Sequence, residues 1–421
     1  MATPAQRTNT WTLDEWYDQS VAGTTGGYQG AKELWSMGSE NEGAGGWNSQ
    51  VRYSSPVQIP AGSGKAWKSL VHGYTTGYGA NVNNANGNQT MFAIKTDGTL
   101  WGWGRNESGE IPVNTSDSYS SPRQIPGTTW SKAYSGRGGG AAFKTDGTLW
   151  LWGSNGSGQM GQEDTTGRSS PVQLSGAWSS FATAGDSSVL AFKTDGSLWA
   201  WGEGGYGSLA QNNQTDYSSP RQISGTDWSH FTTGSGGFGN SRHVYKTDGT
   251  LWGWGSTSYG QLGQNTGPGG GTERFSSPVQ IPAGSGKTWT TVGGGEVFIG
   301  RKNDGTLWGM GRNFRGQLGQ NGPANLNYSS PVQIGNESTW STNIFCNDVY
   351  CGGVKTDGSM WLWGFYDNGQ FGLNSRDSIG PGTTDGDAGI SSPVQLSGTW
   401  TGVLGESVAQ GYRNTYFMKN V

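Results

Sequence analysis

Apolar and polar residues alternate in a short phrase that returns along the chain about every fifty residues. In one copy, Leu100 to Gly104, the order Leu-Trp-Gly-Trp-Gly places both tryptophans on one face of a strand and Leu100 with the glycines on the other. An Asp-Gly pair stands just before this phrase and just after another apolar stretch, which is a strong hairpin signal. The pattern therefore predicts short antiparallel strands joined by tight turns.

Three features mark each repeat, and their number predicts how many units the chain contains. The turn aspartates are Asp97, Asp146, Asp195, Asp248, Asp304 and Asp357. The prolines of a Ser-Ser-Pro segment are Pro56, Pro122, Pro171, Pro220, Pro278, Pro331 and Pro393. The tryptophans that follow this segment are Trp67, Trp130, Trp178, Trp228, Trp289, Trp340 and Trp400. Seven prolines and seven tryptophans against six turns predict seven units, one of which lacks its turn.

The two ends of the chain are expected to form the incomplete unit together. Leu34 to Gly38 resembles the Leu-Trp-x-Trp-Gly strand, and Thr415 to Lys419 resembles the strand that elsewhere precedes the turn. Pairing the two in one sheet closes a ring and removes free sheet edges, which otherwise invite aggregation. We therefore predict an all-β fold: a single seven-bladed β-propeller over residues 31–421, with four antiparallel strands per blade and the last blade closed by strands from both termini.

Residues 1–30 stand outside the repeat and form a predicted N-terminal extension. Thr12 and Glu15 make a capping box, and Leu13, Trp16 and Tyr17 share one face of a short amphipathic helix. Two interpretations remain open for this face. It packs on the propeller itself, or Leu13, Trp16 and Tyr17 anchor the protein in a larger assembly.

A Gly-Gln-Leu-Gly segment follows the Leu-Trp-x-Trp-Gly strand at residues 260–263, and again at residues 316–319. With the period and the Asp-Gly turn, this segment resembles the regulator of chromosome condensation repeat. The resemblance covers about residues 31 to 421 and implies a β-propeller that works through protein–protein interaction. The activity best known in that family is guanine-nucleotide exchange on a small GTPase, combined with chromatin binding.

Composition argues against several other classes of protein. The chain has 26 Lys and Arg against 30 Asp and Glu, for a net charge of −4, and its basic residues form no run, so nucleic acid is not an expected partner. Neither a signal peptide nor a membrane span is expected, because no long apolar stretch occurs. The only cysteines, Cys346 and Cys351, are two free thiols or a local bridge.

No group of residues points to catalysis or to a bound cofactor. His72, His230 and His243 fall in different phases of the repeat, without a carboxylate or cysteine at a spacing that suggests a dyad or a metal site. The expectation from sequence is therefore a protein that is not an enzyme, with no catalytic residues, no metal and no cofactor.

Long connections between strands are expected on one face of the propeller. Antiparallel order puts the first-to-second and third-to-fourth connections of every unit on that face and the Asp-Gly turns on the other, and long loops on a rigid scaffold concentrate binding residues. Aromatic and arginine side chains are typical interface anchors. Those predicted to bind a partner are Trp47, Tyr74, Tyr78, Phe238, Tyr259, Phe314, Arg315, Phe365, Tyr366 and Arg376.

The N-terminal segment and the regular phrases KTDGTLWGWG and YSSPVQIP also resemble propeller proteins encoded by tailed phages of marine cyanobacteria. This resemblance implies a phage structural protein located in the virion, made in the host cytoplasm and used as a head decoration or as a tail or fibre element for host attachment. Its partners would be other virion proteins and a host surface receptor or glycan. Two alternatives are a cytoplasmic bacterial interaction scaffold and a guanine-nucleotide exchange factor.

The predicted closure of the ring is testable by truncation. Ending the chain before Thr415 removes the strand that is expected to pair with Leu34 to Gly38, and so exposes two sheet edges. The shortened protein is expected to aggregate or to melt at a much lower temperature, measured by thermal unfolding. An unchanged melting temperature would contradict the predicted closure.

Overall fold

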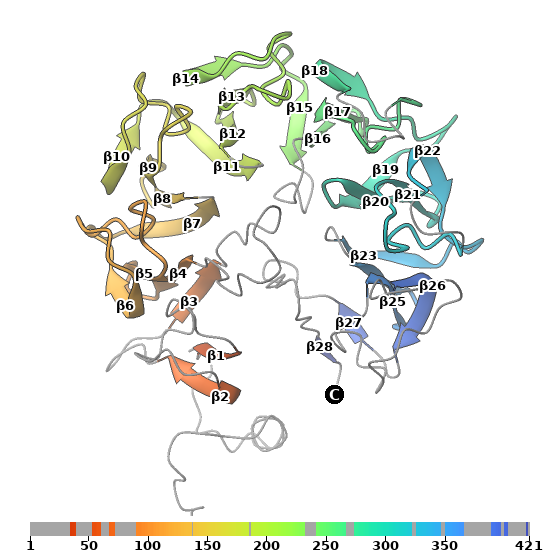
Figure 1. Ribbon diagram of the computed structural model, residues 1–421, viewed down its shortest axis with the longest axis horizontal. Coiled ribbons are helices and arrows are strands. Elements are labelled where there is room, and N and C mark those ends of the chain that lie inside the picture. Colours follow the sequence, from red (N-terminus) through yellow and green to blue (C-terminus); the bar gives the residue numbers. More distant parts are fainter. Residues whose placement is uncertain are drawn as a thin grey trace, which may run out of the picture. The chain divides into compact units, whose positions relative to one another are not determined.

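The computed structural model describes residues 34–38, 53–59, 67–71, 90–136, 138–184, 187–231, 241–266, 273–321, 326–346, 350–365, 389–396, 400–402 and 418–419. All the regular elements within these ranges are β-strands, and Figure 1 shows them as a series of small sheets. Six sheets have four strands each, in which consecutive strands pair antiparallel, and we call these sheets blades 1 to 6. The all-β fold predicted from the sequence is confirmed.

Three blades come first along the chain. Blade 1 contains β3 (Trp67–Val71), β4 (Thr90–Lys95), β5 (Leu100–Gly104) and β6 (Tyr119–Gln124). Blade 2 contains β7 (Trp130–Gly136), β8 (Gly139–Lys144), β9 (Leu149–Gly153) and β10 (Arg168–Leu174). Blade 3 contains β11 (Trp178–Ala184), β12 (Ser188–Lys193), β13 (Leu198–Gly202) and β14 (Tyr217–Gln222).

Three more follow. Blade 4 contains β15 (Trp228–Phe231), β16 (Ser241–Lys246), β17 (Leu251–Ser256) and β18 (Arg274–Gln280). Blade 5 contains β19 (Trp289–Gly293), β20 (Val297–Lys302), β21 (Leu307–Gly311) and β22 (Tyr328–Gln333). Blade 6 contains β23 (Trp340–Cys346), β24 (Tyr350–Lys355), β25 (Met360–Phe365) and β26 (Gly389–Leu396).

Both ends of the chain form two-stranded sheets. At the N-terminal end β1 (Leu34–Gly38) pairs antiparallel with β2 (Tyr53–Ile59), and at the C-terminal end β27 (Trp400–Gly402) pairs antiparallel with β28 (Met418–Lys419). These are the strand pairs expected to make the seventh blade. The pairing of β1 with the C-terminal strand, and with it the count of seven, stays a prediction, as does the division at residue 30.

Each Asp-Gly turn is held by a short chain of hydrogen bonds. In blade 2, Asp146 Oδ1 accepts from the Thr148 amide at 2.9 Å and from the Thr148 hydroxyl at 2.7 Å, and that hydroxyl accepts from Trp150 Nε1 at 2.9 Å. The set recurs at Asp97–Thr99–Trp101, Asp195–Ser197–Trp199, Asp248–Thr250–Trp252, Asp304–Thr306–Trp308 and Asp357–Ser359–Trp361. The turn thereby fixes the indole ring of the strand that follows it.

These turns do not have the type I′ geometry that an Asp-Gly pair favours, in which both central residues have positive φ. Gly147 has a φ of +83° and its amide donates to the Lys144 carbonyl at 3.0 Å, but Asp146 is not among the residues with positive φ. The chain therefore makes an ordinary turn followed by a left-handed glycine, the common three-residue hairpin connection. The hydrogen bonds from Thr148 explain the difference, because they hold the aspartate in a local side-chain turn.

The lysine before each turn packs on two tryptophans of its own blade. In blade 2 the Lys144 Nζ lies 4.1 Å from the centre of the Trp150 ring and 5.1 Å from that of Trp130, on the first strand. The lysines in this position are Lys95, Lys144, Lys193, Lys246, Lys302 and Lys355. Such cation–π contacts contribute roughly 0.5–1 kcal/mol each at exposed sites and more when shielded from water.

The hydrophobic core lies between neighbouring blades. Within blades 1 and 2, the Trp152 ring stands edge-on to Phe92 of the preceding blade at 5.6 Å, and its Nε1 donates to the Glu110 carbonyl of that blade at 2.7 Å. Buried clusters repeat this arrangement between blades 3 and 4, 4 and 5, and 5 and 6. At about 25 cal/mol per Å² and roughly 150–250 Å² of surface, each buried ring contributes roughly 4–6 kcal/mol before entropy.

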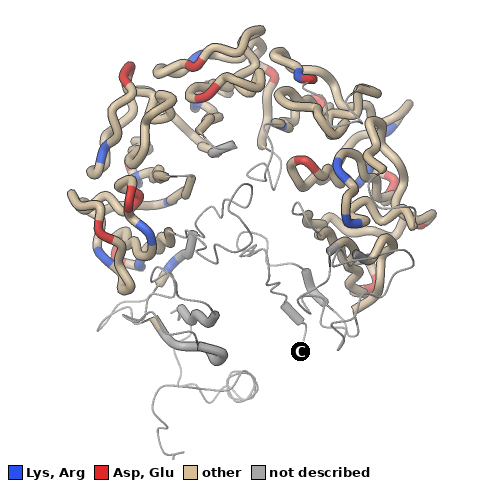
Figure 2. The backbone as a smooth tube through the Cα atoms, in the orientation of Figure 1, with Lys and Arg blue, Asp and Glu red and all other residues tan. Residues whose placement is uncertain are grey.

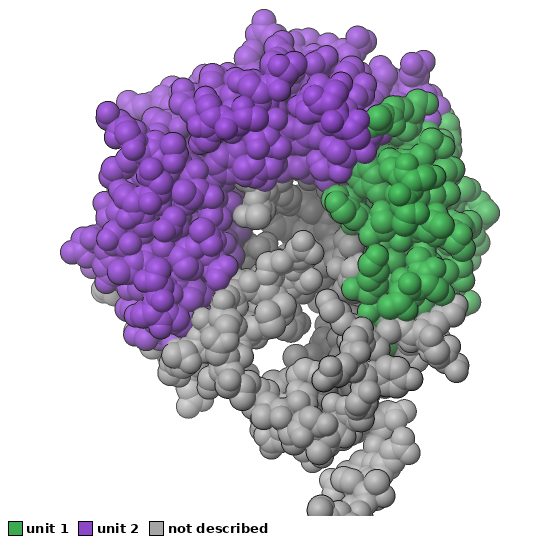
Figure 3. Space-filling view, turned by 180° about the vertical axis from the view of Figure 1, so that it is seen from behind, with its two compact units in different colours: residues 1–156, 166–177, 421 green, residues 157–165, 178–420 purple. Residues whose placement is uncertain are grey.

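The described residues group into two compact units, drawn in green and purple in Figure 3. The first consists of residues 1–156, 166–177 and 421, and it includes blades 1 and 2. The second consists of residues 157–165 and 178–420, and it includes blades 3 to 6.

The capped turns predict a loss of stability in acid. Hydrogen bonds from the side chain and then the backbone of the residue two positions on hold the pKa of Asp146, Asp195, Asp248 and Asp357 below the ordinary value. Because the unfolded chain takes up these protons at higher pH than the folded one, the contribution is complete above the unfolded pKa, near 4, and is lost as pH falls toward the folded values.

The measurement is the free energy of unfolding in urea between pH 6 and pH 2.5. A variant with asparagine at these four positions keeps a hydrogen-bond acceptor but does not titrate, so it should lose less stability across that range than the parent protein. Equal losses in both proteins would show that the turns do not cause the acid dependence.

Candidate functional site

The third-to-fourth connections of blades 1, 2, 4 and 5 share one loop frame, in which a side chain two positions on holds the amide of the residue before a glycine. In blade 5 the Leu318 amide donates to Asn313 Oδ1 at 3.0 Å, and the Arg315 amide donates to Gln317 Oε1 at 2.7 Å. Between them Gly316 has a φ of +77°, a conformation that side chains rarely adopt. The amides of Ser108, Ser157 and Tyr259 are held in the same way as that of Arg315, by Glu110, Gln159 and Gln261.

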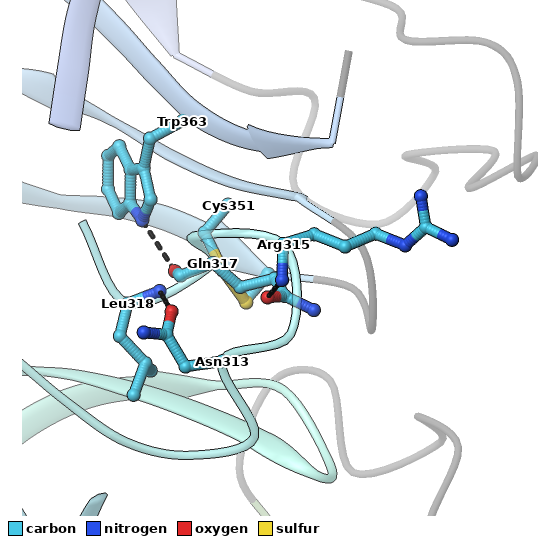
Figure 4. The surroundings of a disulfide bond; sticks show 7 residues. Asn313, Arg315, Gln317, Leu318, Cys351 and Trp363 are labelled. Carbon is cyan, nitrogen blue, oxygen red and sulfur yellow. Dashed lines mark hydrogen bonds between the residues drawn. A yellow bond between two sulfur atoms is a disulfide. The ribbon is translucent and has the colours of Figure 1, made fainter. Parts of the chain in front are cut away.

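Two hydrogen bonds fasten the loops of blades 1, 2, 3 and 5 to the next blade. One fastens the loop of blade 4, because Met310 stands in blade 5 where the other four blades have the donating tryptophan. Trp363 Nε1 of blade 6 donates to the Gln317 carbonyl at 2.6 Å (Figure 4), and the Asn321 amide donates to the Ser391 carbonyl at 2.7 Å. The second bond recurs from Asn114 to Ser169, from Glu163 to Ser218, from Asn212 to Ser276 and from Asn265 to Ser329. All five donors, Asn321 included, have a positive φ. The Ser-Ser-Pro segments are therefore docking points for the loop of the preceding blade.

The space at each docking point explains the loop glycine. A Cβ atom at Gly316 would lie 2.7 Å from the Cα atom of Ser391, and one at Gly158 would lie 2.4 Å from that of Ser218. No side chain fits at such a distance, so the loop can approach the outer strand only with glycine there. The pairing of the outer strand is irregular at this segment. In blade 5, for example, the register between β21 and β22 shifts between Gly309 and Gly311.

The residue just before this glycine varies from blade to blade, and we call these five positions the tip residues. They are Ser108, Ser157, Tyr206, Tyr259 and Arg315 in blades 1 to 5. Tyr206 is 44% exposed and is the one aromatic residue among the large exposed hydrophobic residues of the described ranges. Loops with the same glycine conformation thus present two small hydroxyls and then, in blades 3, 4 and 5, the side-chain types that dominate protein interfaces.

Blades 4 and 5 meet in an aromatic and charged cluster at the tip residues. The rings of Tyr259 and Phe314 stand perpendicular with centres 5.7 Å apart. The Arg312 guanidinium lies 4.6 Å from the centre of the Phe314 ring and 5.4 Å from that of Tyr259, and its Nη1 is 2.8 Å from Glu296 Oε2. Burial raises the pKa of Glu296, while the charge of Arg312 opposes that rise. The ion pair orients Arg312 beneath the two rings.

This cluster also confirms which connections share a face. The Arg312 amide, after the third strand of blade 5, donates to the Glu296 carbonyl in its first-to-second connection at 2.9 Å. The same contact joins Ser154 to Gly138 in blade 2 and Glu203 to Ser187 in blade 3. In blades 2, 3 and 5 the first-to-second and third-to-fourth connections therefore lie together, as the antiparallel order predicts.

Three of the ten predicted binding residues fall in this site: Tyr259, Phe314 and Arg315. Phe365 is the last residue of β25. The predicted binding residues outside the described ranges are Trp47, Tyr74, Tyr78, Phe238, Tyr366 and Arg376, and the predicted anchors Leu13, Trp16 and Tyr17 lie outside them too. Their roles stay predictions.

Sequence reasoning missed two residues of the site, Tyr206 and Arg312. Tyr206 has the same place before a loop glycine as Tyr259, so aligning the repeats on that glycine would have found it. The role of Arg312 depends on Glu296 and on an aromatic ring of the preceding blade, and only the fold brings these together.

The histidines and cysteines are parts of the packed sheets. His243 is buried against Phe298, and burial lowers its pKa to about 4, so it is neutral at pH 7. His230 stacks on Tyr245, and His72 lies outside the described ranges. Cys346 and Cys351 form a disulfide, which decides between the two possibilities left by the sequence.

Charge and hydropathy add little to this picture. Figure 2 shows the charged residues of the described part as short separate segments of both signs. Within the same ranges, no three metal-binding side chains gather as a cation site would require. Nor does any helix there have the length and apolar character needed to cross a membrane.

Comparisons with known proteins match the repeat and the fold. The model of the regulator of chromosome condensation (RCC1) repeat matches residues 146–191, 195–237 and 248–298. The protein RCC2 homolog of Danio rerio is 32% identical over 133 residues, which are 31% of this chain and 26% of that protein, so the match spans about a quarter of the relative's length.

Three solved structures share the fold at low sequence identity. Human WBSCR16 has a TM-score of 0.63 at 17% identity, over 88% of this chain and 96% of that one. Prp20p from Saccharomyces cerevisiae, described with its binding to Gsp1p and histones, has a TM-score of 0.64 at 15% identity, over 94% and 91%. Yeast RCC1 (Prp20), in a crystal structure with Kap60, has a TM-score of 0.62 at 15% identity, over 95% and 90%.

These matches correct four expectations drawn from the sequence. The interpretation as a phage structural protein is wrong, and so are the virion location and the virion partners, because the similar proteins come from yeast, zebrafish and human and one is described as binding Gsp1p and histones. The expectation that the protein is not an enzyme is also contradicted, because exchange factors with these repeats act catalytically. Missing nucleophiles could not exclude that activity, since exchange proceeds through binding.

The loop frame predicts opposite effects for two reciprocal substitutions. Blade 4 has Thr257 where blade 5 has Asn313, and the buried Thr257 hydroxyl has no hydrogen-bond partner. Asn313→Thr should lower the free energy of unfolding by about 1–3 kcal/mol, because it leaves the buried Leu318 amide without its acceptor. Thr257→Asn should raise it by roughly 1 kcal/mol.

Urea unfolding of the two variants and of the parent protein makes the comparison. Two changes of the same sign would contradict the proposed role of the asparagine in the frame.

Proposed function

We propose that this chain, which belongs to the regulator of chromosome condensation (RCC1) repeat family of β-propellers, binds a small GTPase through its tip residues and promotes release of the bound guanine nucleotide. The observation that carries the proposal is the contrast within one loop position. The glycine after this position has a positive φ in all five blades, and in blades 1, 2, 4 and 5 the amide at this position is held by the side chain two positions on. Its side chain nevertheless changes from serine to Tyr206, Tyr259 and Arg315 in three neighbouring blades. A frame kept constant while its exposed position varies is typical of a recognition surface.

Rigid presentation of these side chains favours tight binding. Gln261 and Gln317 hold the amides of Tyr259 and Arg315, and the rings of Tyr259 and Phe314 support one another. Little conformational entropy is lost when such residues are buried by a partner, because they are already ordered. Tyrosine and arginine are the types that most often contribute more than 2 kcal/mol to an interface.

Exchange needs no catalytic side chain of the usual kind. A protein that binds the nucleotide-free state of a GTPase more tightly than the nucleotide-bound state weakens nucleotide binding by the same factor, because the two equilibria are linked. The catalyst supplies only this differential affinity. Exchange activity therefore does not require a nucleophile or a general base among the tip residues.

A second candidate function is an interaction scaffold that binds a partner without acting on it. The same tip residues support it, since recognition alone needs no differential affinity. Nucleotide release separates the two candidates: a scaffold binds its partner and leaves the release rate unchanged.

Binding and release should depend on the aromatic and arginine tips but not on the serines. With Gsp1p carrying a fluorescent guanine nucleotide as the probe, Tyr206→Ala, Tyr259→Ala and Arg315→Ala are each expected to weaken binding at least about thirtyfold, the effect of an interface anchor. Ser108→Ala and Ser157→Ala change the equivalent position and serve as matched controls, with less than about a twofold effect expected.

Calorimetry gives the affinity and fluorescence gives the rate of nucleotide release. Serine variants that weaken binding as much as the tyrosine and arginine variants would place the interface elsewhere on the chain. Undiminished binding by all three variants would contradict the proposed surface.

A further inference from the structure

Blade 6 contains a disulfide that packs against the loop of the tip residue Arg315. Cys346 at the end of β23 and Cys351 near the start of β24 are paired in register and form a disulfide across the first-to-second connection of blade 6. Both residues are buried, at 4% and 0% exposure. They belong to the cluster that packs blade 6 against blade 5, together with Leu318 and Trp363.

Contacts lead from this disulfide to Arg315 in three steps. Cys351 pairs in register with Trp363 on β25, and Trp363 Nε1 donates to the Gln317 carbonyl at 2.6 Å. The side chain of Gln317 in turn accepts the Arg315 amide at 2.7 Å. Figure 4 shows the loop from Asn313 to Leu318 beside the disulfide, with the Arg315 side chain extending away from it.

No other blade has a cysteine pair at this place. In blade 3 the residues at the equivalent register position are Thr183 and Val189, which pair with each other, and Val189 pairs with Trp201 as Cys351 pairs with Trp363. Trp201 still donates to the Gln159 carbonyl at 2.8 Å. The disulfide is therefore not required for the tryptophan hydrogen bond. It is an additional constraint at the one described blade interface that supports Arg315.

We propose that the Cys346–Cys351 disulfide is a redox switch for the loop that carries Arg315: the oxidised form holds the loop in the ordered frame, and the reduced form loosens it. The claim that this switch regulates partner affinity rests on the proposed function of the tip residues. The claim that the disulfide is coupled to the loop is independent of that function.

Packing gives the reason for the coupling. Two sulfurs that are no longer bonded must separate to a van der Waals distance, about 3.5–4 Å for heavy atoms. Around this disulfide the space is filled, since Val297, Leu318 and Trp363 of the same cluster are all fully buried. Extra volume in a packed core forces its neighbours to shift, and Leu318 belongs to a loop, which yields more easily than a central strand.

The switching reaction balances as a thiol–disulfide exchange. A soluble dithiol attacks one sulfur, the Cys346–Cys351 bond breaks, and a mixed disulfide forms; the second thiol of the reductant then displaces the protein sulfur. Two electrons and two protons pass to the protein, which gains two thiols, and the reductant leaves as a cyclic disulfide. Because both sulfurs are buried, the exchange requires opening of the hairpin and should be slow.

Amide hydrogen exchange of the full chain, before and after treatment with dithiothreitol, tests the coupling. The amides of Arg315 and Leu318 are expected to exchange about tenfold faster or more in the reduced protein, because their hydrogen bonds depend on the frame. The Tyr259 amide is bound to Gln261 in the same way in blade 4 and is the internal control, with no change expected.

A matched variant guards against effects of the reductant itself. Cys346→Thr with Cys351→Val copies the equivalent pair of blade 3, Thr183 and Val189, and its exchange rates should not respond to dithiothreitol. Unchanged rates at Arg315 and Leu318 after complete reduction, shown by thiol titration, would overturn the proposal, and so would an equal increase at Tyr259.

Affinity for Gsp1p, measured on both forms, separates this proposal from the proposed function. Weaker binding by the reduced form, by about tenfold, supports regulation of the surface. Equal binding by both forms overturns the regulatory role while leaving the proposed function intact. Failure of both forms to bind contradicts the proposed partner, and hydrogen exchange then decides the coupling alone.

Discussion

The hydrogen bond from the second tryptophan of a third strand to the loop of the preceding blade is the interaction on which the rest of the structure depends. Trp152, Trp201, Trp254 and Trp363 make it in blades 2, 3, 4 and 6, with distances between 2.6 and 2.8 Å, and blade 5 has Met310 at this position. The same indole ring fills the space between two sheets, so a single side chain both packs the core and positions the loop. Since burying an indole without a partner for its N–H would be costly, the core and the loops are fixed together.

This arrangement separates stability from recognition. The Asp-Gly turns, the lysine and tryptophan stacks and the docking of loops on the Ser-Ser-Pro segments recur with almost the same geometry in blade after blade. The tip residues Tyr259 and Arg315 are held through their backbone amides, a bond that does not require a particular side chain. They are consequently free to differ, and they do differ between blades.

Much of the fold could be predicted from the sequence because its repeated features are local. Two tryptophans in alternation and an Asp-Gly pair specify a hairpin and its buried face within a dozen or so residues. The surface formed by the tip residues was predicted only in part. Tyr259, Phe314 and Arg315 could be predicted from their residue type and loop position. The support of Arg312 by Glu296, and the link from Cys351 through Trp363 to Gln317, join residues of different loops or strands and depend on three-dimensional packing.

The central claim is that partners are recognised by the loop tips of blades 3 to 5, and a footprint by amide hydrogen exchange tests it most directly. The full chain is compared alone and in the presence of saturating Gsp1p. The account predicts slower exchange in residues 203–208, 256–261 and 312–318, with the Asp-Gly turns at Asp195, Asp248 and Asp304 unchanged. Protection confined to the turns, or spread evenly over both faces, would contradict it.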